Sequence, residues 1–347
     1  MKRVLWLLLI SLLLCGVLSS CADDPATPPD GTGTTDPGAE SADPGDTGSG
    51  ETPEGPGTPI QPGEQTEVDV VLFIGGTNMA GRGDAAGSAE CAEGHAYEFR
   101  AVSDPTRLYP MTAEFGSAEN KNYGLQDGGR KTGSLVPAFC EAYYQSTQTP
   151  IVAVSASEGD TTVQDWGAGK GKLEDAAERL AAAVEFVGQS ETYRVRRVLA
   201  VWCQGEADAE AGTVAADYIR GVEALFGALF RRGLETCLVI QTGASVAKPV
   251  QYEIIREAQL QLCSENDRFV MISDAFAGLL EMTAEGGGYT QEAYNLVGTG
   301  AGENAARYVL DPEGYTFVSA SAEVEEEDQY NGPGIELPVD VWKKTED

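Results

Sequence analysis

The chain has 347 residues, seven cysteines, one histidine and a formal net charge of −32 at pH 7. This length allows one large or two small domains. A negative charge of this size argues against a nucleic-acid partner and against flat contact with an anionic membrane surface, but not against an uncharged sugar ligand. No Cys or His spacing is typical of a metal site, so neither a metal nor another cofactor is expected.

Residues 1–20 have the pattern of an export signal. Lys2 and Arg3 precede an apolar run from Val4 to Leu18 that is too short for a comfortable membrane span. The run ends in "LSSC", which fits a bacterial lipobox and predicts lipidation of Cys21. The alternative is an ordinary signal peptide cut near Ala22. We therefore expect an extracytoplasmic, cell-surface protein that a lipid alone anchors to a bacterial membrane.

Residues 21–66 are expected to be a disordered tether, and residues 311–347 an acidic C-terminal extension. Residues 22–66 hold nine of the seventeen prolines, with Gly, Thr, Ser, Ala and acidic residues making up most of the rest. Such a composition cannot bury a core. The stretch "EVEEEDQ" at 323–329 is most simply a solvated tail segment. The globular domain is accordingly predicted over residues 67–310.

Within that domain, apolar strand patterns alternate with helical ones. Continuous apolar strands between amphipathic helices predict a parallel sheet of about five strands, covered on both faces. Thr290 is the expected N-cap of the last helix. The expected strands are 68–74, 151–157, 195–202, 236–242 and 268–274, and the expected helices are 172–187, 215–232, 252–263 and 290–310.

The site of such a fold is expected beyond the carboxyl ends of its strands. Residues 84–135 show little periodicity and many glycines, so they are predicted to be a long surface excursion, which is more often functional than idle.

Three of these strand ends, together with the segment before the last helix, carry unusual sequences. "GGTNMAGRG" follows the first strand, "SEGDTTVQDW" the second and "WCQGEADAE" the third, while "EGGGYTQEAYN" precedes the last helix. In this order they resemble the sialate O-acetylesterase-like branch of the SGNH hydrolases, over roughly residues 67–310. The resemblance implies a flavodoxin-like three-layer α/β/α domain, a relationship to carbohydrate acetyl esterases and an acetylated glycan as ligand.

The resemblance also implies positions for a serine–histidine–acid triad. Thr77 stands at the serine position, Glu285 at the aspartate position and Gly288 at the histidine position. Gly76 replaces the glutamine before the serine, and Asp160 replaces the second glycine of the second motif. The implied oxyanion and supporting residues are Asn78, Gly159, Gln204 and Glu206.

These departures predict a degenerate active site. Threonine is a poor nucleophile without a base, and general-base help is typically worth 10²–10⁴-fold in rate. A carboxylate at Asp160 would oppose a developing oxyanion if it pointed inward. His95, the single histidine, is more simply a surface or loop-packing residue, while Glu206 and Asp208 look supporting. A direct carboxylate base for Thr77 stays open as the alternative.

Residues for sugar binding are expected on the excursion and beside the motifs. The predicted substrate-binding residues are Arg82, Trp166, Tyr97 and Arg107, with Arg100, Asp104 and Tyr109 nearby. Core packing is the alternative for each aromatic residue, and the favoured one for Trp202. Arg82 is also expected to pair with Glu206 or Asp208.

Three functions stay open on the sequence alone. The first is a surface glycan-binding pseudoenzyme or residual esterase, the second an active O-acetyl esterase that uses Thr77 with an unconventional base, and the third a structural surface protein. Five cysteines lie in the domain, so an exported chain would keep at least one free thiol. Buried free thiols are expected at Cys140 and Cys203; the others are Cys91, Cys237 and Cys263.

Overall fold

The computed structural model describes residues 65–284 and 287–320. Several predicted features lie outside the described residues: the signal peptide, the expected lipidation site Cys21, nearly all of the tether, Glu285 and the acidic stretch 323–329. In the described part, no helix is long and apolar enough to span a bilayer.

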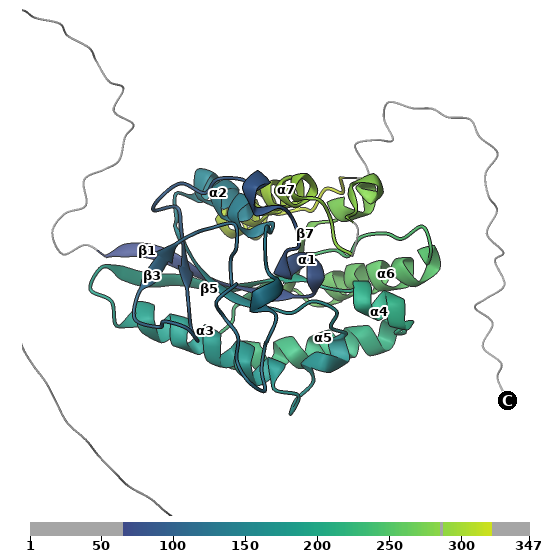
Figure 1. Ribbon diagram of the computed structural model, residues 1–347, viewed down its shortest axis with the longest axis horizontal. Coiled ribbons are helices and arrows are strands. Elements are labelled where there is room, and N and C mark those ends of the chain that lie inside the picture. Colours follow the sequence, from purple (N-terminus) through teal and green to yellow (C-terminus); the bar gives the residue numbers. More distant parts are fainter. Residues whose placement is uncertain (1–64, 285–286, 321–347) are drawn as a thin grey trace, which may run out of the picture. The chain divides into compact units, whose positions relative to one another are not determined.

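The architecture is the predicted three-layer α/β/α sandwich around a central sheet (Figure 1). The sheet has seven strands in the order β3-β2-β4-β1-β5-β6-β7. The five predicted strands are all present and parallel, because each contains an apolar run that the sheet buries on both faces. They are β1 Thr66–Gly75, β4 Ile151–Ser157, β5 Tyr193–Cys203, β6 Thr236–Ile240 and β7 Phe269–Ser273.

Two further strands were not expected from the sequence. β2 (Ala96–Phe99) pairs in parallel with β4, and β3 (Leu108–Pro110) pairs antiparallel with β2. Both belong to the 84–135 stretch, whose interpretation as a surface excursion alone is therefore wrong. The strands are too short for a clear alternation, and β2 contains the buried acid Glu98, whose carboxylate pairs with Arg100.

Helices cover both faces of the sheet and bury one core on each side. α3 (Lys172–Gly188), α5 (Ala215–Phe230) and α6 (Pro249–Glu265) pack with alternate β1 side chains such as Val70 and Leu72. α2 (Val136–Thr147) and α7 (Gln291–Leu310) pack on the other face with Val71 and Phe73 (Figure 1). Thr290 caps α7 by accepting the Ala293 N–H. The sequence patterns did not predict α2.

The described fold continues past both predicted domain boundaries. β1 starts at Thr66, and the Gln65 side chain donates to the Ser190 carbonyl oxygen. At the other end, Tyr315 Oη donates to the Met271 carbonyl oxygen, and the Ala320 N–H donates to Asp274. The chain therefore still contacts the domain ten residues beyond Leu310.

Candidate active site

The carboxyl ends of the three central strands converge, as the motif order predicts. Gly75 lies level with Ser157 of β4 and with Cys203 of β5. Gly75 has a φ of +149°, and a Cβ added there would lie 2.0 Å from the Cys203 carbonyl oxygen. Only glycine allows this approach, which brings the turn after β1 against the turn after β5.

Thr77 sits at the centre of this convergence, at the start of the short helix α1 (Thr77–Ala80). Its Oγ1 accepts the Asp160 N–H at 3.1 Å. A Cβ added to Gly159 would lie 3.2 Å from the same oxygen, and Thr77 and Gln204 line one small cavity. The hydroxyl therefore faces the turn after β4, where its partner is a backbone donor and not a base.

Asp160 occupies the glycine position of the second motif in a left-handed conformation, with φ +61°. Aspartate tolerates this region better than most residues. Its carboxylate is 79% exposed and lies 3.4 Å from Arg130, whereas its N–H points to Thr77. The Asp160 carboxylate therefore points toward solvent at the rim of the site. Its N–H still donates to Thr77, although the family's glycine is replaced.

Asn78 is buried and held from two sides. Its Nδ2 donates to Glu206 at 2.6 Å, and its Oδ1 accepts from Tyr294 Oη at 3.1 Å. Tyr294 Oη in turn accepts the Tyr289 N–H, and burial raises the pKa of Tyr294. Glu206, at the start of α4 (Glu206–Ala211), is therefore a positioning residue for Asn78. Only the "YTQEAYN" motif hinted at Tyr294.

Gln204 and Asp208 tie the third motif to the second. Gln204 Nε2 donates to the Thr161 carbonyl oxygen at 2.8 Å and to Asp208 at 2.5 Å. Asp208 also accepts the Val163 N–H at 2.8 Å, and burial raises the pKa of this carboxyl. The N–H groups of Gln204 are therefore engaged, and its Oε1 is a buried acceptor without a partner.

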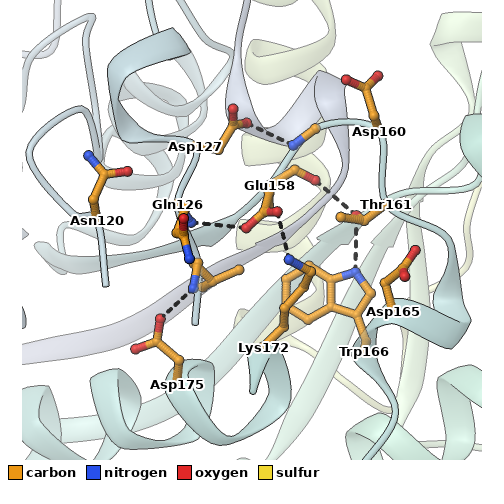
Figure 2. A network of polar contacts seen from close by, with 12 residues as sticks. Asn120, Gln126, Asp127, Glu158, Asp160, Thr161, Asp165, Trp166, Lys172 and Asp175 are labelled. Carbon is orange, nitrogen blue, oxygen red and sulfur yellow. Dashed lines mark hydrogen bonds and ion pairs between the residues drawn. The ribbon is translucent and has the colours of Figure 1, made fainter. Parts of the chain in front are cut away.

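Arg82 does not pair with Glu206 or Asp208, so that prediction is wrong. Its guanidinium binds Asp127 at 2.6 Å, and Arg130 binds the other oxygen of the same carboxylate at 2.7 Å. Asp127 also accepts the Gly159 N–H at 2.7 Å (Figure 2). Burial acts to raise the pKa of Asp127, but the hydrogen bonds from Arg82 and Gly159 outweigh it and hold the pKa below its usual value.

Asp127 was missed in the sequence because it lies 45 residues from Arg82 in the glycine-rich stretch "LQDGGRK". A second contact holds the same loop. Glu158 accepts the Gln126 N–H at 3.0 Å and pairs with Lys172 at 2.6 Å (Figure 2). The excursion is thus fixed directly beside the turn that carries Gly159.

The other predicted sugar-binding residues do not line the pocket at Thr77. Trp166 is fully buried, packs edge-on against Trp202 and donates to Thr161, so its ring offers no exposed sugar platform (Figure 2). Tyr97 packs against Tyr193, at the amino end of β5. Arg107 lies over the Tyr109 ring and pairs with Asp104 in the segment that joins β2 to β3.

Gly288 faces Thr77 at the histidine position of the implied triad. A Cβ added there would lie 3.7 Å from Thr77 Cγ2 and 3.5 Å from Asn78 Oδ1. The same Cβ would meet Tyr294 Oη at 2.7 Å, and Gly288 has a φ of +84°. The position therefore borders the methyl group of Thr77 but supplies no side chain.

His95 cannot reach this site. Its Nδ1 lies 2.8 Å from Glu141, and its ring stacks on Tyr144 with centroids 3.7 Å apart. Its carbonyl oxygen accepts the Ile151 N–H at the amino end of β4, the opposite end of the sheet from Thr77. The loop-packing interpretation of this histidine is confirmed.

All five cysteines of the domain are free thiols, with Cys140 and Cys203 buried.

A cavity of about 820 Å³ opens from Thr77 between α4, α6 and residues 280–284 and 287–289. Its floor includes Thr77 and Asn78, and its walls include Glu206, Tyr252 and Tyr289. This volume falls within the usual range for a small-molecule site. The pocket is thus present beside a hydroxyl that has no histidine partner.

Comparisons with known proteins find a family model and several solved structures that are similar to this domain. A family model described as carbohydrate esterase, sialic acid-specific acetylesterase matches residues 67–299. A comparison with curated proteins finds no match. A solved protein from Arabidopsis thaliana shares the fold, with a TM-score of 0.52 and 18% identity over 72% of this chain and 99% of that one.

Two further solved structures are similar at lower scores. NanS has a TM-score of 0.48 and 13% identity, over 72% of this chain and 99% of its own. A carbohydrate acetylesterase from Xanthomonas citri has a TM-score of 0.47 and 16% identity, over 71% of this chain and 57% of its own.

Proposed function

We propose a function from one premise: the chain belongs to the carbohydrate esterase family of sialic acid-specific acetylesterases. The domain is a glycan-binding module on an esterase scaffold, with at most residual esterase activity. It binds acetylated sugars in the cavity beside Thr77. A lipid on Cys21 and the segment that follows it hold the domain at the outer surface of a bacterial membrane.

The observation that carries this proposal is the glycine that faces Thr77. Gly288 stands at the position of the family's histidine, and a Cβ there would lie 3.7 Å from the Thr77 methyl carbon Cγ2. The single histidine of the chain lies at the other end of the sheet. A hydroxyl without a base attacks an ester slowly, and the parts of a triad fail together when one is lost.

The donors that would stabilise an oxyanion are also largely engaged elsewhere. Gly159 N–H donates to Asp127, and Gln204 Nε2 donates to Thr161 and Asp208. Among the residues implied by the family, Asn78 keeps one amide hydrogen beyond its bond to Glu206. The Asp160 N–H, which now binds Thr77 Oγ1, is a further donor. These features support binding more than turnover.

The test is a pair of measurements on the full chain. Acetate release is followed with an aryl acetate and with acetylated sugars, and binding is followed on a glycan array. We expect binding with turnover far below the ordinary 1–10³ s⁻¹. Turnover in that range that Thr77→Ala abolishes would establish the active esterase instead. Neither binding nor turnover would favour a structural surface protein.

A further inference from the structure

The cavity beside Thr77 is lined by charge of one sign. Asp160, Glu206 and Glu210 contribute carboxylates to its wall, and within residues 65–284 and 287–320 no Lys or Arg lines it. The cations beside it are already paired. Arg82 and Arg130 both bind Asp127, and Arg130 also lies 3.4 Å from Asp160. Lys248 binds Glu210 at 2.6 Å.

A small recess that shares Thr77, Asp160 and Glu206 with this cavity holds a further hydrogen-bond acceptor. Gln204 Oε1 is buried without a partner, in a side chain only 1% exposed. Gln204 lines a recess of about 10 Å³ together with Thr77, Asp160 and Glu206. A recess of this size holds about one water, or one polar group of a ligand. An unmatched buried acceptor favours a ligand that donates there.

We propose that this cavity selects acetylated sugars without charge and rejects sugars that bear a carboxylate. The inference rests on the proposed function, because it concerns the ligand of the same site. Sugar hydroxyls donate to carboxylates and to Gln204 Oε1. The carboxylate of a sialic acid needs a cationic partner, which Arg supplies best. It would here meet three carboxylates, of which Glu206 pairs with no Lys or Arg in the described residues.

The specificity therefore differs from the one in the family's description. Solvent weakens the repulsion between a ligand carboxylate and a partly exposed carboxylate a few ångströms away, but does not abolish it. We expect a discrimination on the order of tenfold in Kd at low ionic strength, shrinking as salt is added.

The test uses one sugar in two charge states. An O-acetylated methyl sialoside with a free carboxylate is compared with its carboxyl methyl ester by NMR titration of the full chain, in about 20 mM and 500 mM salt. The ester is expected to bind about tenfold more tightly at low salt. Equal binding, or tighter binding of the free carboxylate, overturns the inference.

Variants identify the source of the discrimination. Glu210→Gln is expected to narrow the ratio between the two ligands, because Glu210 lines the cavity. Glu253→Gln is the matched control. Glu253 is an acidic residue of α6 that is 55% exposed and pairs with Arg256, and it does not line the cavity. A ratio that both variants leave unchanged counts against the inference.

A further readout needs no sugar binding. Anionic and neutral nitroxides are added to the full chain, and paramagnetic relaxation is compared at the Ala211 and Ala244 amides, whose residues line the cavity. We expect the anionic probe to be depleted there, and Glu210→Gln, but not Glu253→Gln, to relieve the depletion. Failure of every sugar to bind, with this depletion present, refutes the proposed function alone. An anionic probe enriched at these amides refutes the inference on charge.

Discussion

Asp127 accepts the Gly159 N–H at 2.7 Å, so a buried carboxylate of the loop before α2 fixes the turn that follows β4. The same carboxylate binds Arg82 and Arg130. Asp127 is therefore a shared anchor for two of the family's motifs.

Replacing this anchor should destabilise the domain. Asp127→Asn keeps an acceptor for Gly159 but loses the charge that pairs with two arginines, so we expect a loss of about 2 kcal/mol in the free energy of unfolding. Glu178→Gln is the control, because Glu178 is 66% exposed in its pair with Lys121. Urea unfolding at pH 7 measures both. Equal stability of the two variants would contradict the anchoring role.

The pH dependence of this contribution follows from the lowered pKa of Asp127. A carboxyl whose folded-state pKa lies below its unfolded value stabilises the fold above the unfolded pKa, near 3.9. The contribution disappears as pH falls through the folded-state value. The difference between wild type and Asp127→Asn should therefore shrink on acidification below about pH 4. A difference that stays constant down to pH 2 would argue against it.

The triad can be rebuilt only if Tyr294 gives way. Gly288→His alone should give little activity, because its Cβ would meet Tyr294 Oη at 2.7 Å from a left-handed backbone. Thr77→Ser alone should also do little. The combination Thr77→Ser, Gly288→His, Glu285→Asp and Tyr294→Phe should exceed the product of the single effects, because the parts act as a unit.

Acetate release from an aryl acetate measures the repair, with Gly288→Ala as the control for the added Cβ. Simple multiplication of the single effects in the combined variant would show that position 288 does not complete a triad. Gly76→Gln can be added in a second round, since a Cβ at Gly76 would lie 3.4 Å from Gln204 Cγ, an ordinary van der Waals contact.

Lys131 makes stability depend on pH in the alkaline range. It is buried, its Nζ donates to Ser155 Oγ, and burial followed by the charge of Arg179 lowers its pKa to about 7. Between pH 7 and about 10 the unfolded chain binds the extra proton, so the free energy of unfolding gains from rising pH. Lys131→Met should remove this slope. Denaturation at pH 7, 8.5 and 10 checks it, with the exposed Lys170→Met as control; the same slope in both variants would count against it.

Gly75 should be among the least replaceable residues of the site. Gly75→Ala places a Cβ 2.0 Å from a backbone oxygen, so a loss above about 4 kcal/mol is expected. Gly169→Ala is the control: it also has positive φ, +78°, but an added Cβ meets nothing within 4 Å. That change should cost only about 1 kcal/mol. Thermal unfolding of the two variants compares them, and similar losses would contradict the close approach.

Membrane attachment tests the proposal for the N-terminus. Cys21→Ala should release the chain from the membrane fraction, because the lipid is the expected anchor. Mass spectrometry of the wild-type N-terminus should find a lipidated Cys21. An unmodified chain that begins at Ala22 would show an ordinary signal peptide instead.

The sequence predicts those strands and helices whose signal lies in neighbouring residues. The central strands are continuous apolar runs, and α3 and α5 repeat their apolar residues with helical spacing, so both follow from neighbouring residues. β2 and β3 are four and three residues long, and their pairing depends on partners far along the chain. These two strands form through tertiary contacts, which a short stretch of sequence does not reveal.

The site divides in the same way. Motif order predicts that Thr77, Gly159 and Gln204 lie together, because parallel strands end at one edge, and the structure places them so. The pairing of Arg82 with Asp127 was missed, because many acidic residues could pair with Arg82 and the sequence does not show which of them the folded loop brings close. Trp166 was expected as a sugar platform, but an aromatic residue that follows a strand packs inward as readily as outward.

β7 is the outer strand at one end of the sheet, and an outer strand can pair with a strand of another molecule. The segment beyond α7 returns to this strand: Tyr315 Oη bonds the Met271 carbonyl oxygen, and Ala320 N–H bonds Asp274 just after the strand. These residues take up polar groups that would otherwise invite self-association. A chain cut after Leu310 would keep every residue that lines the cavity, but it would lose Phe317 from the core and leave this edge of β7 uncovered, so it should aggregate more readily.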